Sequence, residues 1–123
     1  MEGRNIIKWS EYSEYTELTI SSGDIWMSES ELVDLFGVFI PKLRNAIKDL
    51  YKEELIKPYE TERTIKKRGN LYVTVYNMEV VLLLAFHLNT YQARAVRREL
   101  MERISRDHKP FEVILTALNG IRN

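Results

Sequence analysis

The chain has 123 residues, of which 45% are hydrophobic and 29% charged, a balance that suits one globular domain with a modest core. It contains no cysteine, which excludes disulfides and thiolate metal sites. Its net charge is zero, but residues 1–41 carry two basic and eight acidic side chains, whereas residues 42–68 carry nine basic and five acidic ones. The neutral total therefore conceals a basic segment, and polyanion binding depends on such local charge.

The first predicted element is a short N-terminal β-hairpin. Residues 15–20 (YTELTI) and 25–27 (IWM) are rich in β-branched and aromatic side chains, and Gly23 lies between them in a turn. A helix is predicted to follow, because Ser28 and Glu31 have the spacing of a capping box. Gly37 predicts the end of that helix, since glycine adopts the left-handed conformation without steric cost.

A second helix is predicted to begin near Pro41, whose ring is tolerated in a first helical turn. Its apolar residues recur at i, i+3, i+4 and i+7, and they are Leu43, Ala46, Ile47 and Leu50. The other faces carry polar side chains, namely Lys42, Arg44, Asn45 and Lys48. The two helices and the glycine turn between them predict a helix-turn-helix over about residues 28–52, whose second helix would enter the major groove of DNA.

Two strands are predicted next, at residues 61–66 and 71–76, with Gly69 in the turn between them. The hairpin is basic, with Arg63, Lys66, Lys67 and Arg68. A basic hairpin directly after the second helix predicts a wing, over about residues 61–76, that contacts DNA phosphates. The alternative for Lys66 to Arg68 is a solvated turn without a ligand.

The remainder, about residues 77–123, is predicted to be helical. Asn77 can cap an apolar helix at the centre of the domain, Thr90 can cap a helix from Tyr91 to about residue 106, and a last short helix covers residues 111–120. Arg94, Arg97 and Arg98 form a secondary basic patch, or else pair with nearby glutamates on the helix surface. The expected fold is a single α+β domain over residues 1–123, a winged helix-turn-helix with an N-terminal β-hairpin, a β-hairpin wing and added C-terminal helices.

No catalytic or metal-ligating pattern stands out, and neither an enzyme nor a cofactor is expected. His87 lies in the apolar helix, where a core histidine is the usual reading, and His108 has no partner constellation. The longest apolar run, residues 80–86, is too short to span a bilayer. The first residues lack the basic-then-apolar pattern of a signal peptide, so a soluble cytoplasmic protein without membrane contact is expected.

The start of the second helix, Phe39-Ile40-Pro41, is unusually apolar for a DNA reader. Phe39 is expected to pack in the turn, whereas Ile40 is left open between turn packing, contact with thymine methyl groups and a role in binding a protein partner. Asn45 is the best candidate for a base edge. Whether the helix reads bases or only holds phosphates stays open at this point.

Two blocks of the chain resemble the RhuM-like virulence-associated proteins of bacteria. In residues 20–55 the matching positions are Trp26, Leu35-Phe36-Gly37 and Ile47-Lys48. In residues 72–100 they are Tyr76-Asn77, Asn89, Ala93 and Arg97-Arg98. The resemblance covers about residues 15–106, and the same plan is similar to the Bro-N and KilA-N domains of phages and large DNA viruses.

The resemblance implies a DNA-binding module of a mobile element or prophage-type locus, acting as a transcriptional regulator or an antirepressor-like protein. The expected partner is double-stranded DNA, and the C-terminal helices are candidates for a homodimer contact. The alternative is a protein-interaction module that uses the same helix-turn-helix surface without sequence-specific DNA binding. In that case Phe39, Ile40 and Pro41 would anchor a partner protein.

Overall fold

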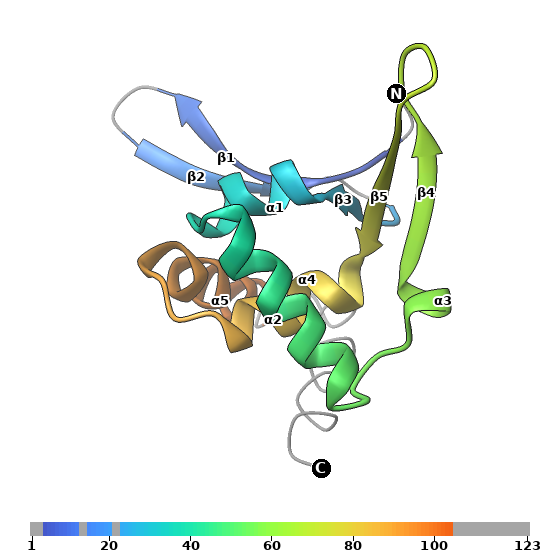
Figure 1. Ribbon diagram of the computed structural model, residues 1–123. Coiled ribbons are helices and arrows are strands. Elements are labelled where there is room, and N and C mark those ends of the chain that lie inside the picture. The colour runs from blue at the N-terminus through green and yellow to red at the C-terminus, as the bar shows by residue number, and fades with distance from the viewer. Residues whose placement is uncertain (1–3, 13–14, 21–22, 105–123) are drawn as a thin grey trace.

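The computed structural model describes residues 4–12, 15–20 and 23–104, and within them the protein is a mixed α+β fold (Figure 1). The strands are β1 (Ile7–Tyr12), β2 (Tyr15–Ile20), β3 (Trp26–Ser28), β4 (Glu62–Lys66) and β5 (Tyr72–Asn77). The helices are α1 (Glu29–Phe36), α2 (Ile40–Lys52), α3 (Pro58–Thr61), α4 (Met78–His87) and α5 (Tyr91–Ile104). Figure 1 shows the two hairpins, β1–β2 and β4–β5, projecting on opposite sides of the helices.

The strands form two separate antiparallel sheets. β1 pairs with β2 along its whole length, whereas β3, β5 and β4 form a three-stranded sheet in that order. The predicted pairing of residues 15–20 with 25–27 is therefore wrong, although both segments contain strand. β3 instead lies on β5, where Met27 faces Tyr76 and both side chains are buried, so a long-range apolar contact takes precedence over the nearby turn.

Helix α1 begins and ends as its local sequence predicts. The Ser28 hydroxyl accepts a hydrogen bond from the Glu31 backbone N–H at 3.4 Å, and the Glu31 carboxylate accepts one from the Ser28 backbone N–H at 2.9 Å. This is the predicted capping box, which satisfies two donors that the first turn leaves free. Gly37 ends the helix with φ +64°, in the left-handed conformation that glycine adopts most readily.

Helix α4 is the centre of the core, as its composition predicts. All six residues from Val80 to Ala85 are buried, and Asn77 caps the helix by accepting a hydrogen bond from the Val80 backbone N–H. The expectation that His87 belongs to this core is wrong, because it is the last residue of α4 and its side chain is 35% exposed. No helix among the described residues combines the length and apolar character that crossing a bilayer requires.

Helix α5 packs on α4 and α1 and is capped by Thr90, as predicted. Its core side is formed by Ala93, Val96 and Leu100, which are all buried. The predicted helix at residues 111–120, His108 and the proposed homodimer contact of the C-terminal segment lie at least partly beyond residue 104, outside the described residues.

Candidate nucleic-acid interface

Helix α2 presents most of the predicted DNA-contacting side chains to solvent. Its apolar stripe is buried as predicted, in Leu43, Ala46, Ile47 and Leu50. Lys42, Asn45 and Lys48 are exposed on the remaining surface, and Lys52 is exposed at the end of the helix. The spacing of the sequence therefore placed these side chains on the correct faces, which leaves their amine and amide groups accessible to a ligand.

The start of α2 has no side-chain cap. The residue at the cap position is Phe39, and Ile40 and Pro41 are the first two residues of the helix. The phenylalanine offers no acceptor to the free N–H groups of the first turn, so these groups are satisfied only by water or by a bound group. The helix begins at Ile40, one residue before the predicted start near Pro41.

Arg44 does not project freely from α2 but forms a two-point ion pair with Glu29, the first residue of α1. Its Nε donates to Glu29 Oε2 at 3.0 Å and its Nη2 donates to Glu29 Oε1 at 2.9 Å. The Arg44 side chain is still 63% exposed, whereas that of Glu29 is 26% exposed. The sequence did not indicate Glu29 as part of this site, since no local pattern relates two positions 15 residues apart.

Two tyrosines lie where α2 meets the three-stranded sheet: Tyr51 on α2, and Tyr76 on β5 near the Arg44–Glu29 pair. The Tyr51 hydroxyl donates a hydrogen bond to Glu62 Oε2, with 2.5 Å between the two oxygens. Burial together with this hydrogen bond raises the pKa of Tyr51. Burial, with help from the carboxylates of Glu62 and Glu29, raises the pKa of Tyr76 to about 12, and Arg44 opposes the shift. Both phenols therefore stay neutral at physiological pH, and α2 is joined to β4 by a hydrogen bond between side chains.

The β4–β5 hairpin carries its basic residues at an exposed tip. Lys66, Lys67 and Arg68 are all exposed, and the turn is closed by the Lys67 N–H donating to the Leu71 carbonyl at 2.7 Å. Arg63 is different, because its guanidinium stacks over the Trp26 ring with 4.1 Å to the ring centroid. The tip therefore offers three cations to solvent, whereas Arg63 has an intramolecular partner.

The secondary patch of Arg94, Arg97 and Arg98 does not act as one unit. Arg97 donates to the backbone carbonyls of Ala85 and Leu88, so it satisfies acceptors that the end of α4 leaves free. Arg94 donates to the Asn89 side chain at 3.3 Å, and Arg98 is exposed. Arg97 is thus a structural residue, which the arginine spacing on its own could not reveal.

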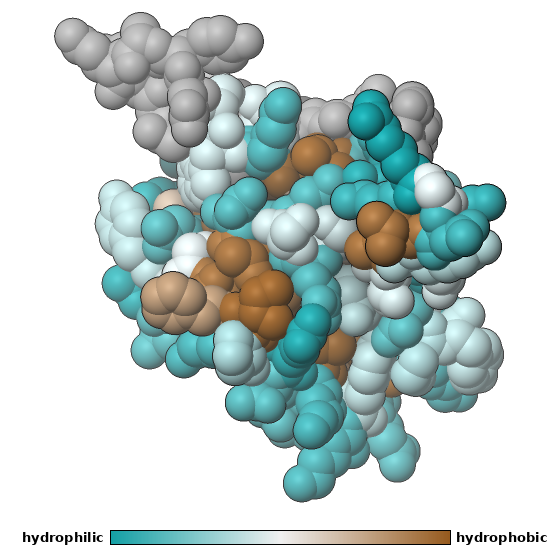
Figure 2. Space-filling view, turned by 45° about the horizontal axis from the view of Figure 1, so that its top comes forward, coloured by the Kyte–Doolittle hydropathy of each residue, from teal (hydrophilic) through white to brown (hydrophobic). Residues whose placement is uncertain are grey.

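The expected turn packing of Phe39 is wrong, because its side chain is 84% exposed. Ile40 is half-buried and Pro41 is exposed. Figure 2 shows compact hydrophobic patches on one face of the protein that is otherwise mainly hydrophilic. The apolar opening of α2 therefore remains accessible to a binding partner.

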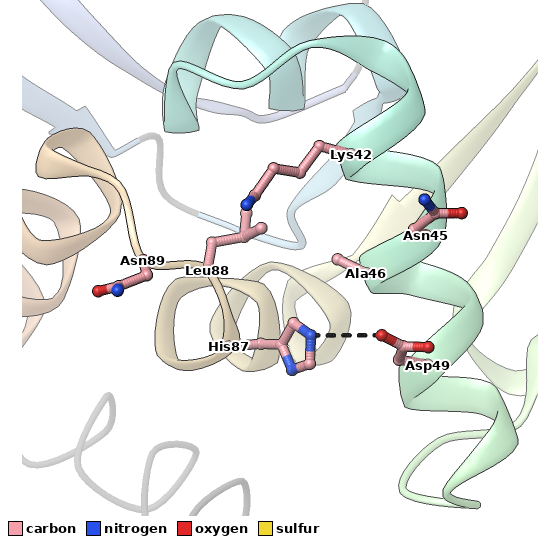
Figure 3. Close-up of a pocket in the computed structure, with 7 residues that line it drawn as sticks. All are labelled: Lys42, Asn45, Ala46, Asp49, His87, Leu88 and Asn89. Carbon is pink, nitrogen blue, oxygen red and sulfur yellow. Dashed lines mark ion pairs between the residues drawn. The ribbon is translucent and has the colours of Figure 1, made fainter.

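A shallow groove of about 480 Å³ lies between α2 and the end of α4. Its lining residues are Lys42, Asn45, Ala46, Asp49, His87, Leu88 and Asn89. Figure 3 shows Lys42 extending across the groove toward Leu88, while Asn45 points away from it. His87 Nε2 lies 3.8 Å from Asp49 Oδ2, a loose contact that forms an ion pair only when the imidazole is protonated.

Among the described residues, no three histidine, aspartate or glutamate side chains gather in a way that could hold a metal ion. Comparison with protein-family models, with curated proteins and with solved structures found no match. What the chain does must therefore be inferred from its own residues and their geometry.

Proposed function

We propose that the protein is a cytoplasmic, non-enzymatic DNA-binding module with a winged helix-turn-helix plan. The observation that carries this proposal is the order of elements around the three-stranded sheet. A strand, β3, leads into the helix pair α1–α2, and the chain then returns through β4 and β5 with β5 in the middle of the sheet. A three-residue turn containing Gly37 joins the two helices, as is typical of a helix-turn-helix.

In this proposal α2 is the helix that enters the major groove. Its exposed surface carries Lys42, Asn45 and Lys48, with Arg44 at the side nearer α1. Asn45 supplies a side-chain amide that can bond both acceptor and donor on an adenine edge. The lysines supply charge toward phosphates, which positions the protein without reading sequence.

The β4–β5 hairpin is the proposed wing. Its tip carries Lys66, Lys67 and Arg68 in exposed positions, and Figure 1 shows the hairpin extending beyond the helices. Three accessible cations at the end of a projecting hairpin suit contact with the phosphate backbone. Arg63 is left out of this contact, because its stacking on Trp26 fixes it within the sheet.

The resemblance to RhuM-like proteins and to Bro-N and KilA-N domains supports the biological side of the proposal. On that basis the module acts as a transcriptional regulator or antirepressor-like protein of a bacterial mobile element or prophage-type locus. The matching blocks cover the helix pair, with the proposed DNA-contacting helix α2, and the segment from β5 to α5, whereas the hairpin tip lies between them.

The test is a fluorescence-anisotropy titration of a random-sequence duplex at several salt concentrations. The wild type is expected to bind with steep salt dependence, and K66A/K67A/R68A is expected to reduce the slope of log K against log salt by about 3. The triple variant K8A/K57A/R98A removes three exposed cations outside α2 and the hairpin tip, so it matches the loss of charge and serves as the control. Absence of binding to any duplex at low salt contradicts the proposal.

A second candidate function is favoured by one observation, the 84% exposure of Phe39. Such an accessible ring in the turn suits an anchor for a partner protein, with Ile40 and Pro41 beside it. Phe39→Ser separates the two functions. Loss of partner capture with unchanged DNA affinity favours the protein-interaction module, whereas loss of DNA affinity places Phe39 in the DNA interface.

A further inference from the structure

We propose that Glu29 is a positioning residue that holds Arg44 in readiness to read a guanine base, an inference that rests on the proposed DNA-binding function. The two side chains meet edge to edge. Glu29 occupies the edge of the guanidinium formed by Nε and Nη2, at 3.0 and 2.9 Å. The adjacent edge, formed by Nη1 and by the second hydrogen of Nη2, donates to no acceptor among the described residues.

The occupied edge fixes the orientation of the free one. A guanidinium is planar and carries five donors in a rigid fork, so two hydrogen bonds on one edge determine where the other edge points. Because the Arg44 side chain is already ordered before DNA binds, a contact through its free edge costs less conformational entropy. The 63% exposure of its side chain leaves that edge accessible.

Glu29 is itself held by a chain of contacts. It follows Ser28, which lies in β3 and caps α1 together with Glu31. Arg4 in turn donates to both oxygens of Glu31, at 2.7 and 2.8 Å, and to the Trp26 carbonyl at 3.0 Å. Because these contacts hold the first turn of α1 in place, the Glu29 carboxylate gives Arg44 a defined position. A carboxylate on a mobile loop would not, because it would move with the loop.

The charge of the pair favours a base over a phosphate. A phosphate is attracted mainly by net positive charge, and Glu29 cancels that of Arg44. What remains is a directional pair of donors, which matches the two adjacent acceptors, O6 and N7, that guanine presents in the major groove. Lys42 and Lys48 on the same helix are exposed and have no such carboxylate partner among the described residues, so their charge can attract phosphates.

The experiment is selection of duplexes from a random pool by four proteins: the wild type, Glu29→Gln, Arg44→Lys and Asp34→Asn. Asp34 is exposed on α1 and makes no ion pair with the described residues, so D34N controls for the loss of one negative charge. The wild type and D34N are expected to prefer guanine at one position by roughly 10- to 100-fold. In E29Q and R44K this preference is expected to fall below about threefold, while retention of the unselected pool stays equal or rises.

Four results overturn the inference, and they are distinguishable from one another. Unchanged guanine preference together with unchanged affinity in E29Q shows that Glu29 does not position Arg44. Tighter binding of every duplex by E29Q, without a change in preference, shows that Glu29 only sequesters the arginine. A wild type that binds DNA without any preference sensitive to R44K shows a phosphate contact, which leaves the proposed function intact, whereas a wild type that retains no duplex overturns both proposals.

Discussion

Thr90 is hydrogen-bonded to Phe36 across 54 residues of sequence. Its hydroxyl donates to the Phe36 backbone carbonyl at 2.7 Å and accepts from the Ala93 backbone N–H at 3.0 Å. One side chain therefore caps the start of α5 and satisfies an acceptor that the end of α1 leaves free. This contact joins the start of α5 to the end of α1, next to the turn between α1 and α2.

Thr90→Ala removes both hydrogen bonds at once. We expect the free energy of unfolding to fall by about 1–2 kcal/mol, since the cap is lost and the Phe36 carbonyl loses a partner. Urea denaturation followed by circular dichroism measures the change. Thr90→Ser keeps the hydroxyl and is the matched control, with a change well below that of T90A. Equal midpoints for T90A and the wild type contradict this role.

Gly37→Ala tests the turn of the helix pair. At φ +64° an alanine is strained, and its Cβ would lie 2.5–2.6 Å from the Gln92 side-chain atoms. The strain alone costs about 1–2 kcal/mol. Gly69→Ala is the control, because Gly69 has φ +68° but no atom within 4 Å of its would-be Cβ.

The atoms in question are the far end of the exposed Gln92 side chain, which can move aside, so we expect G37A and G69A to lose similar stability. Urea midpoints measure both losses. A loss in G37A well above that in G69A, which disappears in a Gln92→Ala background, would show that the Gln92 side chain is held in place, and no loss in G37A would contradict the left-handed conformation of the turn.

The features that the sequence predicted are those with local causes. Helix ends depend on residues within one helical turn, so short sequence patterns predict them. Examples are the caps at Ser28 and Asn77 and the end of α1 at Gly37. The apolar stripe of α2 and the burial of α4 follow from helical periodicity. The exposed lysines of α2 were found by the same reasoning.

The features that the sequence did not predict depend on residues that are distant along the chain. β3 pairs with β5 because their buried faces match, although a glycine turn lies next to β3. Glu29 meets Arg44 only after α1 and α2 have packed, and Arg97 meets the end of α4 only after α5 has docked. Phe39 is exposed whereas Val38, its neighbour in the same turn, is buried, a difference that depends on the packing of the two helices.

Phe39→Ser tests this exposure directly. Because the ring is 84% exposed, we expect no loss in the free energy of unfolding, and a gain of about 1 kcal/mol where the new serine accepts a hydrogen bond at the uncapped start of α2. Phe36 lies three residues earlier and is fully buried, so Phe36→Ala should lower the free energy of unfolding by about 3–5 kcal/mol. This variant shows that the assay detects the loss of a buried side chain. A large loss of stability in F39S would restore the turn-packing interpretation.

The Arg4–Glu31 pair gives stability that depends on pH. Burial alone would raise the pKa of Glu31, but hydrogen bonds from Arg4 and from the Ser28 backbone outweigh it and lower the pKa from its ordinary value of 4.5. A carboxyl with a lowered folded-state pKa stabilises the protein above its unfolded pKa. That stabilisation is lost as the pH falls below 4.5 and through the folded-state value.

We therefore expect the stability difference between the wild type and Glu31→Gln to shrink on acidification from about pH 6.5 to about pH 3.5. Arg4→Gln removes the partner and should show the same convergence with the wild type. Urea midpoints at the two pH values measure both differences. A gap that is constant or widens toward acid indicates that the pair does not lower the pKa of Glu31.

Amide chemical-shift mapping tests whether α2 and the β4–β5 tip together form a DNA interface. A random-sequence duplex is titrated into isotope-labelled protein at low salt. We expect shifts concentrated at Lys42–Lys48 and at Lys66–Arg68, which disappear at high salt. No shift at low salt, or shifts confined to the β1–β2 hairpin and α5, would contradict it.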